Sequence, residues 1–249
     1  MNYIGIIPAR FASTRFPGKP LADINGKSMI QRVYEQASKA LEHVYIATDD
    51  SRISDHVKAF GGKVVITSDK HQSGTDRLAE AIDLIHKLHS ERFDVIINIQ
   101  GDEPFIQPAQ IKELISCFDN PLTKIASLVK KIENNEDVFD VNKPKVIFNK
   151  KMQAIYFSRS PIPYIRNTEK EKWHLKHSFY KHIGMYAYKV KALQELTELE
   201  QSPLELAESL EQNRWIENGY VIYLAITKFD SFGIDTPEDL KKALTQKSH

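Results

Sequence analysis

The stretch NYIGIIPARFASTRFPGKPLADINGKSMI, residues 2–30, predicts how the fold begins. Its apolar run, residues 3–7, stops at a proline, and a short loop carrying Arg10, Arg15 and Lys19 follows. A strand-like run that ends at proline before a loop is typical of the first unit of an α/β fold. Loops at the carboxyl ends of parallel strands are where such folds bind ligands. Three cations in this loop therefore indicate a polyanionic ligand.

Strand-like and helical patterns alternate through the first half of the chain. The apolar runs HVYIAT, KVVIT, DVIINIQ and IASLVK follow the opening strand. Helical spacing of apolar residues appears after Ser28, near Ser51, over residues 78–88 and after Pro108. Strand–helix alternation with nearly continuous apolar strands predicts an α/β fold with a mostly parallel central sheet and helices on both faces.

The second half of the chain departs from this rhythm. KVIFNKKMQAIYFSR predicts a hairpin that turns at residues 149–151, and RSPIPYIRNTEKEKWHLKHSF predicts a long surface loop. HIGMYAYK and YVIYLAIT predict further strands, residues 203–213 predict a helix, and GIDTPEDL predicts a helix start capped by Thr236. We therefore expect a single domain over residues 1–249, with a β-rich excursion at about 145–190.

Composition and charge narrow the possible partners. The 34 basic and 33 acidic residues give a net charge of +1, so no global field draws the protein to nucleic acid or to a membrane surface. The hydrophobic content of 41% suits an ordinary globular core. The N-terminal apolar run is too short for a signal peptide or a transmembrane helix. A single cysteine, Cys117, excludes a disulfide framework within the chain and favours a cytoplasmic location.

Two familiar nucleotide-binding motifs are absent from the sequence. No GxGxxG follows the first strand, which argues against a dinucleotide-binding dehydrogenase. The GKS at residues 26–28 lacks the first glycine of a P-loop, because Leu21 stands at that position. A tight turn at Asn25-Gly26 with Ser28 capping the next helix explains this segment instead.

A second polar cluster supports the anion site. DVIINIQGDEPF runs an apolar strand directly into Gln100, Gly101 and Asp102. A carboxylate at the end of a central strand is well placed for Mg²⁺, which prefers one or two carboxylates together with substrate phosphates. A solvated basic loop and a polar turn would explain the two clusters separately, but their joint presence favours a site for a nucleoside triphosphate.

The motifs together resemble a known enzyme family. IIPARFASTRFPGKPL, HQSGTDRLAE, NIQGDEP, FSRSPIPY, HIGMYAY, SPLELAESLEQNRW and GIDTPEDL are similar, in this order, to the 3-deoxy-D-manno-octulosonate (Kdo) cytidylyltransferases. The resemblance implies a nucleotide-diphospho-sugar transferase fold, CTP and Kdo as substrates, and Mg²⁺ as cofactor. It also implies CMP-Kdo and pyrophosphate as products, a role in lipopolysaccharide synthesis, and a homodimer. The excursion at about 145–190 would then serve sugar binding and dimerisation.

The resemblance also implies roles for single residues around the nucleotide. Arg10, Arg15 and Lys19 would hold the triphosphate, and Asp102 and Asp235 would share Mg²⁺; these five residues are the expected catalytic set. The nucleotide-binding residues implied are Pro8, Ala9, Arg10, Arg15, Lys19, Gln72, Ser73, Gly74 and Arg77, with the last four beside the cytosine and Arg77 near its carbonyl edge. From the residues alone, Ser73 to Arg77 is equally a helix start capped by Thr75, and Asp235 is equally a residue beside a helix cap.

For the sugar, the resemblance implies Gln100, Arg159, His182, Tyr186, Glu211 and Gln212. Kdo carries a carboxylate and many hydroxyls, which suit a cation such as a protonated His182 and several hydrogen-bonding side chains. From the residues alone, Tyr186 could be a core strand residue and Glu211 a solvated helix residue.

Two alternatives stay open at this point. The acidic sugar could be another one, such as 8-amino-Kdo or sialic acid. The chain could also be a nucleotide-binding module without catalysis, although all expected phosphate and metal ligands are present together.

Overall fold

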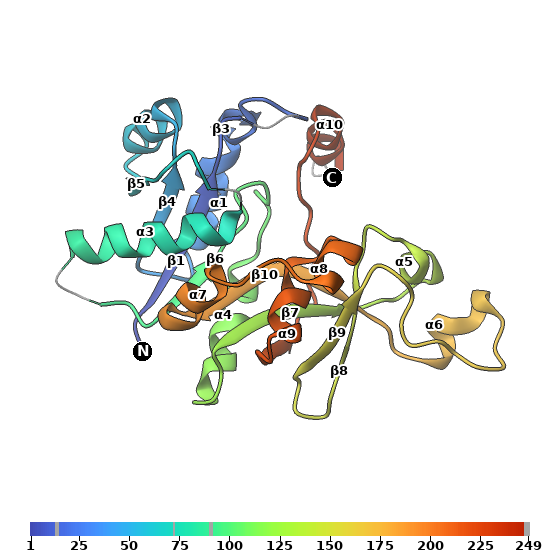
Figure 1. Ribbon diagram of the computed structural model, residues 1–249. Coiled ribbons are helices and arrows are strands. Elements are labelled where there is room, and N and C mark those ends of the chain that lie inside the picture. Colours follow the sequence, from blue (N-terminus) through green and yellow to red (C-terminus); the bar gives the residue numbers. More distant parts are fainter. Residues whose placement is uncertain (13–14, 72, 90–91, 247–249) are drawn as a thin grey trace. The chain divides into compact units, whose positions relative to one another are not determined.

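The opening apolar run forms strand β1 (Tyr3–Ala9) of a computed structural model, which describes residues 1–12, 15–71, 73–89 and 92–246 (Figure 1). The chain forms two compact units. The first comprises Met1–Lys112, Tyr188–Thr197 and Ser231–His249, and the second comprises Glu113–Ala187 and Glu198–Asp230. The expected single domain with an excursion stays a prediction.

The first unit contains a parallel sheet in the strand order β6-β1-β4-β5. Its elements besides β1 are η1 (Lys19–Leu21), β2 (Asp23–Ile24), β3 (Lys27–Ser28), α1 (Met29–Ala37), β4 (Val44–Thr48), α2 (Ser51–Ala59), β5 (Val64–Ile66), α3 (Gly74–Leu88), β6 (Val95–Asn98), α7 (Val190–Thr197) and α10 (Pro237–Gln246). Helix α4 (Pro108–Ser116) begins in the first unit and ends in the second. β1, β4 and β6 are almost fully buried, which explains their nearly continuous apolar sequences.

The strand order reverses at β1, and this reversal positions the site. The chain runs from β1 outward through β4 to β5, and then returns to β6 on the other side of β1. Because such crossovers are right-handed, α1 and α2 cover one face and α3 covers the other. Ligands of open α/β sheets bind beyond the carboxyl ends of the strands at such a reversal. The loops after β1 and β6 occupy that position.

Capping side chains set the helix starts of the first unit. Ser28 caps α1 by accepting a hydrogen bond from Gln31 N, as expected, and the Asn25-Gly26 turn joins β2 to β3 with positive φ at both residues. The prediction that Thr75 caps the helix near residue 75 was wrong. The cap is Ser73, which forms a reciprocal capping box with Asp76, while Thr75 lies buried inside the first turn.

The second unit combines parallel and antiparallel strands. Its elements are η2 (Cys117–Asp119), β7 (Ile125–Lys131), α5 (Asn135–Phe139), β8 (Lys145–Phe148), β9 (Ala154–Ser158), η3 (Lys170–Lys172), α6 (Trp173–Lys176), most of β10 (Tyr180–Lys189), α8 (Pro203–Glu208), α9 (Glu211–Glu217) and β11 (Ile222–Ile226). β11 is parallel to β7, whereas β8 pairs antiparallel with β9 and with β10. The mostly parallel sheet with helices and the hairpin around residues 149–151 are therefore confirmed.

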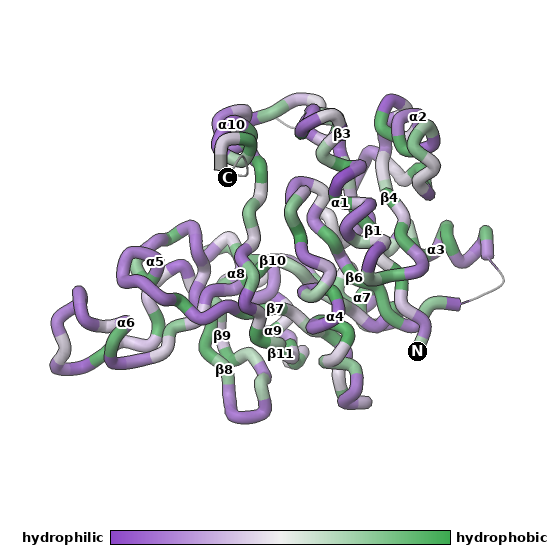
Figure 2. The backbone as a smooth tube through the Cα atoms, turned by 180° about the vertical axis from the view of Figure 1, so that it is seen from behind, coloured by the Kyte–Doolittle hydropathy of each residue, from purple (hydrophilic) through white to green (hydrophobic). Residues whose placement is uncertain are grey.

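The charged segment over residues 159–179 was predicted as a loop, and this prediction was wrong in part. It contains η3 and α6, and the indole of Trp173 is 2% exposed in a cluster with Ile132, Val138 and Phe179. Figure 2 shows that hydrophilic residues predominate around α6. The segment is thus charged overall, but the buried rings of Trp173 and Phe179 anchor it.

The helix predicted over residues 203–213 is two helices. Ser209 adopts the left-handed conformation with φ 51°, which ends α8 before α9 begins at Glu211. A serine has no strong preference for this conformation, so its sequence carries little signal for the break. Among the described residues, no helix is long and apolar enough to cross a membrane.

Candidate active site

The three predicted cations line one cavity in the first unit. The cavity has a volume of about 350 Å³ and lies beyond the carboxyl ends of β1 and β6. Its lining residues are Pro8, Ala9, Arg10, Ala12, Arg15, Lys19, Pro20, Gln100, Gly101, Asp102 and Asp235. Seven of the residues predicted from the phosphate loop and the metal pair are therefore brought together: Pro8, Ala9, Arg10, Arg15, Lys19, Asp102 and Asp235.

Lys19 joins the two predicted metal carboxylates. Its Nζ lies 2.7 Å from Asp102 Oδ2 and 3.0 Å from Asp235 Oδ1, and its side chain is only 14% exposed. Burial alone would lower the pKa of Lys19, but Asp102 and then Asp235 outweigh that effect and raise the pKa above its ordinary value. The Lys19 side chain therefore carries a full positive charge between two carboxylates.

The two arginines differ in how they are held. Arg15 is 66% exposed and approaches Asp235 Oδ2 at 3.2 Å, so its guanidinium keeps most of its donors for a ligand. Arg10 donates from Nη2 to the carbonyl oxygen of His71. Because His71 comes just before the predicted base-reading segment, Arg10 connects the phosphate loop to that segment.

A glycine brings the two strand ends together. A Cβ on Gly101 would lie 2.7 Å from the carbonyl oxygen of Pro8, which is closer than real Cβ atoms approach. Any larger residue would push apart the loops that carry Arg10 and Asp102. Gly101 thus makes the convergence of the cations and the carboxylate possible.

Two contacts tie the segment before α10 to the strand end at β6. The amide of Ile234 donates to the carbonyl oxygen of Asp102 at 2.9 Å, and Ser231 Oγ donates to Glu103 Oε1 at 2.5 Å. Burial raises the pKa of Glu103 to about 7. The sequence indicated no role for Ser231 or Glu103, although Glu103 belongs to the QGDEP motif.

The predicted base-reading segment starts helix α3. Ser73 caps the helix and Gly74 is its first residue, while Gln72 lies outside the described residues. Arg77 is fully buried, and its guanidinium donates to Asp49 Oδ2 and Thr67 Oγ1, both at 2.6 Å. Arg77 therefore fastens the start of α3 to the ends of β4 and β5. Asp49 and Thr67 were not foreseen, because nothing in their local sequence marks them as partners.

The carboxylate pair suits a hard divalent cation. Asp102 and Asp235 already share one cationic partner, and their oxygens are the anionic ligands that Mg²⁺ takes in small number beside phosphate oxygens and water. In the described part of the chain, no three His, Cys, Asp or Glu side chains gather as a complete protein-made metal site. The two carboxylates therefore suit a metal ion whose remaining ligands are phosphate oxygens and water.

The sugar-binding residues predicted from the resemblance lie in both units. Gln100 lines the cavity of the first unit, whereas Arg159, His182, Tyr186, Glu211 and Gln212 belong to the second. The Arg159 guanidinium donates to three main-chain carbonyls, of Val141, Glu208 and Ser209. Arg159 therefore also secures the end of α8, a role that the sequence did not indicate.

Three of these residues form one cluster in the second unit. The rings of His182 and Tyr186 lie 5.3 Å apart, and burial, followed by the charge of Glu211, raises the pKa of Tyr186 well above its ordinary value. Glu211 also accepts a hydrogen bond from Arg214 at 2.8 Å. The expectation of a protonated His182 was wrong, because desolvation lowers its pKa to about 3 and keeps the imidazole neutral near pH 7.

Gln212, another predicted sugar residue, has a buried amide group with a donor that is unpaired in the described part of the chain. Its side chain is 5% exposed, and its Nε2 has no hydrogen-bond partner among the residues that the structure describes. A buried amide donor without a partner is costly. This donor is available for a hydrogen bond to a bound molecule.

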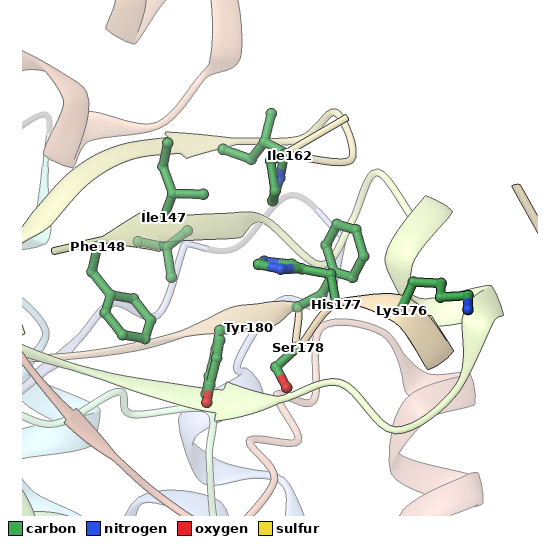
Figure 3. Close-up of a pocket in the computed structure, with 10 residues that line it drawn as sticks. Ile147, Phe148, Ile162, Lys176, His177, Ser178 and Tyr180 are labelled. Atoms are coloured by element: carbon green, nitrogen blue, oxygen red, sulfur yellow. The ribbon is translucent and has the colours of Figure 1, made fainter. Parts of the chain in front are cut away.

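The second unit also has a cavity of its own. It measures about 420 Å³ and is lined mainly by apolar and aromatic side chains from β8, β10 and residues 162–163, with Lys176 and His177 at the end of α6 (Figure 3). The rings of Phe148 and Tyr180 meet there at 5.0 Å. None of the predicted sugar residues lines this cavity.

Comparisons with known proteins span the chain. A family model described as Cytidylyltransferase matches residues 4–228. The 3-deoxy-manno-octulosonate cytidylyltransferase of Parabacteroides distasonis is 59% identical, over 98% of this chain and 97% of that protein. The 8-amino-3,8-dideoxy-manno-octulosonate cytidylyltransferase of Shewanella piezotolerans is 46% identical, over 97% of this chain and 96% of that protein. A solved structure of CMP:2-keto-3-deoxy-manno-octonic acid synthetase complexed with CTP has a TM-score of 0.90 and 41% identity, and the match covers 100% of this chain and 99% of that one.

Proposed function

Because this chain belongs to the cytidylyltransferase family, and within it to the 3-deoxy-manno-octulosonate cytidylyltransferases, we propose that it transfers CMP from CTP to the anomeric hydroxyl of Kdo. The products are CMP-Kdo and pyrophosphate, for use in lipopolysaccharide synthesis. The family resemblance and the fold predicted from the sequence are confirmed. The observation that carries the proposal is Lys19 between Asp102 and Asp235, in one cavity with Arg10 and Arg15.

The cations and strand ends of this cavity would bind the nucleotide. Arg10, Arg15 and Lys19 hold the triphosphate, and their charges suit its roughly four negative charges once Mg²⁺ is included. Pro8 and Ala9 run along the nucleotide, and Gln72, Ser73 and Gly74 lie beside the cytosine. The contact of Arg77 with the base stays a prediction, since its buried guanidinium supports a role in holding the loop.

Asp102 and Asp235 would hold Mg²⁺ together with phosphate oxygens. Bound Mg²⁺ supplies charge neutralisation and acidifies or orients the attacking hydroxyl. The chain's own residues align the α-phosphate with that hydroxyl, which attacks in line while pyrophosphate leaves. Positioning and charge stabilisation carry most of the catalysis in such transfers, so no side-chain nucleophile is required.

Gln100, Arg159, His182, Tyr186, Glu211 and Gln212 would bind the sugar. The unpartnered amide donor of Gln212 supports this assignment, because a sugar hydroxyl or carboxylate would accept its hydrogen bond. We further propose one nucleotidyltransferase domain over residues 1–249 that acts as a homodimer in the cytoplasm. In it, residues 145–190 would serve sugar binding and dimerisation.

A second candidate substrate is 8-amino-Kdo, favoured by the relative of Shewanella piezotolerans that carries its name. The deciding experiment measures pyrophosphate release from CTP with Kdo, 8-amino-Kdo and sialic acid in parallel, with Mg²⁺ present. We expect the highest kcat/KM with Kdo. A preference for another sugar would change the substrate, and CTP binding without turnover on any sugar would indicate a non-catalytic module.

A further inference from the structure

A buried serine contacts the predicted sugar residue His182. Ser127 lies on β7, the strand next to β10, which carries His182 (Figure 1). The Ser127 side chain is fully buried. Its Oγ lies 2.9 Å from His182 Nε2, 3.0 Å from the carbonyl oxygen of Met185 and 3.4 Å from that of Ile183.

Counting protons assigns the direction of these hydrogen bonds. A hydroxyl carries one proton, and a carbonyl oxygen can only accept. We assign the proton of Ser127 to the Met185 carbonyl at 3.0 Å, which is the nearer of the two carbonyls and can only accept. With this assignment, the 2.9 Å contact is a donation from His182 Nε2–H to Ser127 Oγ.

The other ring nitrogen of His182 is left as an acceptor. Desolvation lowers the pKa of His182 to about 3, so a ring protonated at Nε2 carries no proton at Nδ1. The rings of Phe157 and Tyr186 flank the imidazole at 5.0 and 5.3 Å. Nδ1 makes no hydrogen bond with any residue that the structure describes, and the side chain is partly exposed.

We propose that Ser127 is a positioning residue, which holds His182 in the Nε2–H tautomer so that Nδ1 accepts a hydrogen bond from a sugar hydroxyl. A carboxylate has no proton to donate, so His182 does not bind the carboxylate of the sugar. This assignment to a hydroxyl rests on the proposed function, whereas the tautomer is a property of the free protein. By holding this tautomer, Ser127 makes His182 a partner for a sugar hydroxyl and leaves the sugar carboxylate to other residues.

Nitrogen NMR of the intact protein, labelled with ¹⁵N-histidine, tests the tautomer. Spectra are recorded near pH 7, and His182→Gln identifies the His182 signals. We expect one nitrogen typical of an N–H group at Nε2 and one typical of an unprotonated nitrogen at Nδ1. A proton on Nδ1, alone or together with one on Nε2, would overturn the proposal.

Variants of Ser127 test its part in this arrangement. Ser127→Ala removes the acceptor of Nε2–H, so the tautomer signals should mix and the KM for Kdo should rise about tenfold, with a smaller change in the KM for CTP. Ser127→Thr keeps the hydroxyl and should restore the tautomer. Thr123→Val is the matched control, because Thr123 is an equally buried hydroxyl of the same unit that donates to the carbonyl of Cys117. An unchanged tautomer and KM in Ser127→Ala would refute the role of Ser127.

Addition of Kdo to the labelled protein tests the contact of His182 with a sugar hydroxyl separately from the tautomer of the free protein. We expect the Nδ1 signal to shift on binding while Nδ1 stays unprotonated. If Nδ1 takes up a proton from solvent when Kdo binds, the Kdo carboxylate lies beside His182 and stabilises the imidazolium, which would overturn the assignment to a hydroxyl. Saturation by Kdo without any change at His182 would remove this residue from the sugar site, and with it that part of the proposed function. The tautomer held by Ser127 in the free protein would still stand.

Discussion

At the scale of single residues, charge is distributed unevenly over the three cations of the phosphate loop. Lys19 is nearly buried and neutralised by Asp102 and Asp235, whereas Arg15 is largely exposed and only touches Asp235. A planar guanidinium with free donors is suited to bind phosphate oxygens in pairs. Arg15 is therefore the cation whose loss should affect catalysis most and folding least.

Arg15→Ala should lower kcat/KM for CTP by on the order of 10³ or more, because an arginine that stabilises charge in phosphoryl transfer has that weight. Its free energy of unfolding should stay within about 0.5 kcal/mol of the wild type, as for other exposed positions. Steady-state kinetics and urea unfolding measure both quantities. Lys27→Ala, which removes an exposed cation paired with Glu35 outside the cavity, is the control and should keep activity. An Arg15→Ala protein with more than a tenth of wild-type kcat/KM would contradict the phosphate-loop assignment.

The neutral His182 should make stability depend on pH. Its pKa falls from 6.5 to about 3 on folding, so the unfolded chain binds a proton below pH 6.5 while the folded protein does not. The stabilisation is fully present above pH 6.5 and falls by about 1.4 kcal/mol per pH unit as the pH drops toward 3. Between pH 7 and pH 5, the wild type should lose about 2 kcal/mol more of its unfolding free energy than His182→Gln does. Urea unfolding at both pH values measures the difference, and equal losses would show that His182 titrates normally.

At the scale of elements, neighbouring residues at the start of α10 have different tasks: Thr236 and Asp239 cap the helix, whereas Asp235 faces the cavity. Thr236 Oγ1 accepts from the amide of Asp239, and Asp239 Oδ2 accepts from the amides of Asp235 and Thr236. The Asp235 carboxylate takes no part in this cap and instead contacts Lys19 and Arg15. Helix α10 therefore positions Asp235 without needing its charge.

Asp235→Asn should lower kcat strongly and raise the Mg²⁺ concentration needed for half-maximal rate, because a hard cation loses an anionic ligand. Its melting temperature without ligands should match the wild type, since the cap of α10 is intact. Asp239→Ala is the matched control: it should cost about 1 kcal/mol of stability through the cap and leave the Mg²⁺ requirement unchanged. Thermal melts and Mg²⁺ titrations of the rate distinguish the two carboxylates. Normal turnover of Asp235→Asn at limiting Mg²⁺ would show that Asp235 does not bind the metal and is only a residue beside the cap of α10.

At the scale of the whole molecule, the predicted site residues fall into two compact units. The nucleotide and metal residues all belong to the first, and the sugar residues other than Gln100 belong to the second. Substitutions in the second unit should therefore alter sugar use without altering nucleotide binding.

Glu211→Ala and Tyr186→Phe should each raise the KM for Kdo and leave the affinity for CTP within about twofold of wild type, since neither side chain belongs to the unit that holds the phosphate loop. Calorimetry with CTP and Mg²⁺, followed by kinetics with varied Kdo, makes the comparison. Tyr223→Phe is the control, because its hydroxyl lies in the second unit and contacts Gln153 outside the predicted site. A matching loss of CTP affinity in either variant would move that residue out of the sugar site.

Local patterns in the chain were enough for much of the fold. The buried strands β1, β4 and β6 appear as apolar runs, and the helix starts at Ser28 and Pro237 carry capping signals, because both depend on neighbours along the chain. The cation loop and the QGDEP motif likewise stand in short stretches, and Arg10, Arg15, Lys19 and Asp102 from them line one cavity. The break at Ser209 and the anchor Trp173 were missed, since a single backbone conformation and a single buried ring leave no period in the sequence.

The partners of those residues came from tertiary contacts alone. Lys19 forms an ion pair with Asp235, Arg77 forms one with Asp49, and His182 forms a hydrogen bond with Ser127. The two residues of each pair lie far apart in the chain, so no local spacing in the sequence encodes the contact. The same holds for protonation: the sequence shows a histidine at position 182, but its neutral state results from desolvation by the surrounding fold. The amino-acid sequence thus determined which chemical groups are present and which local elements carry them. Long-range packing determined the partners of these groups, their protonation states and the orientation of their hydrogen bonds.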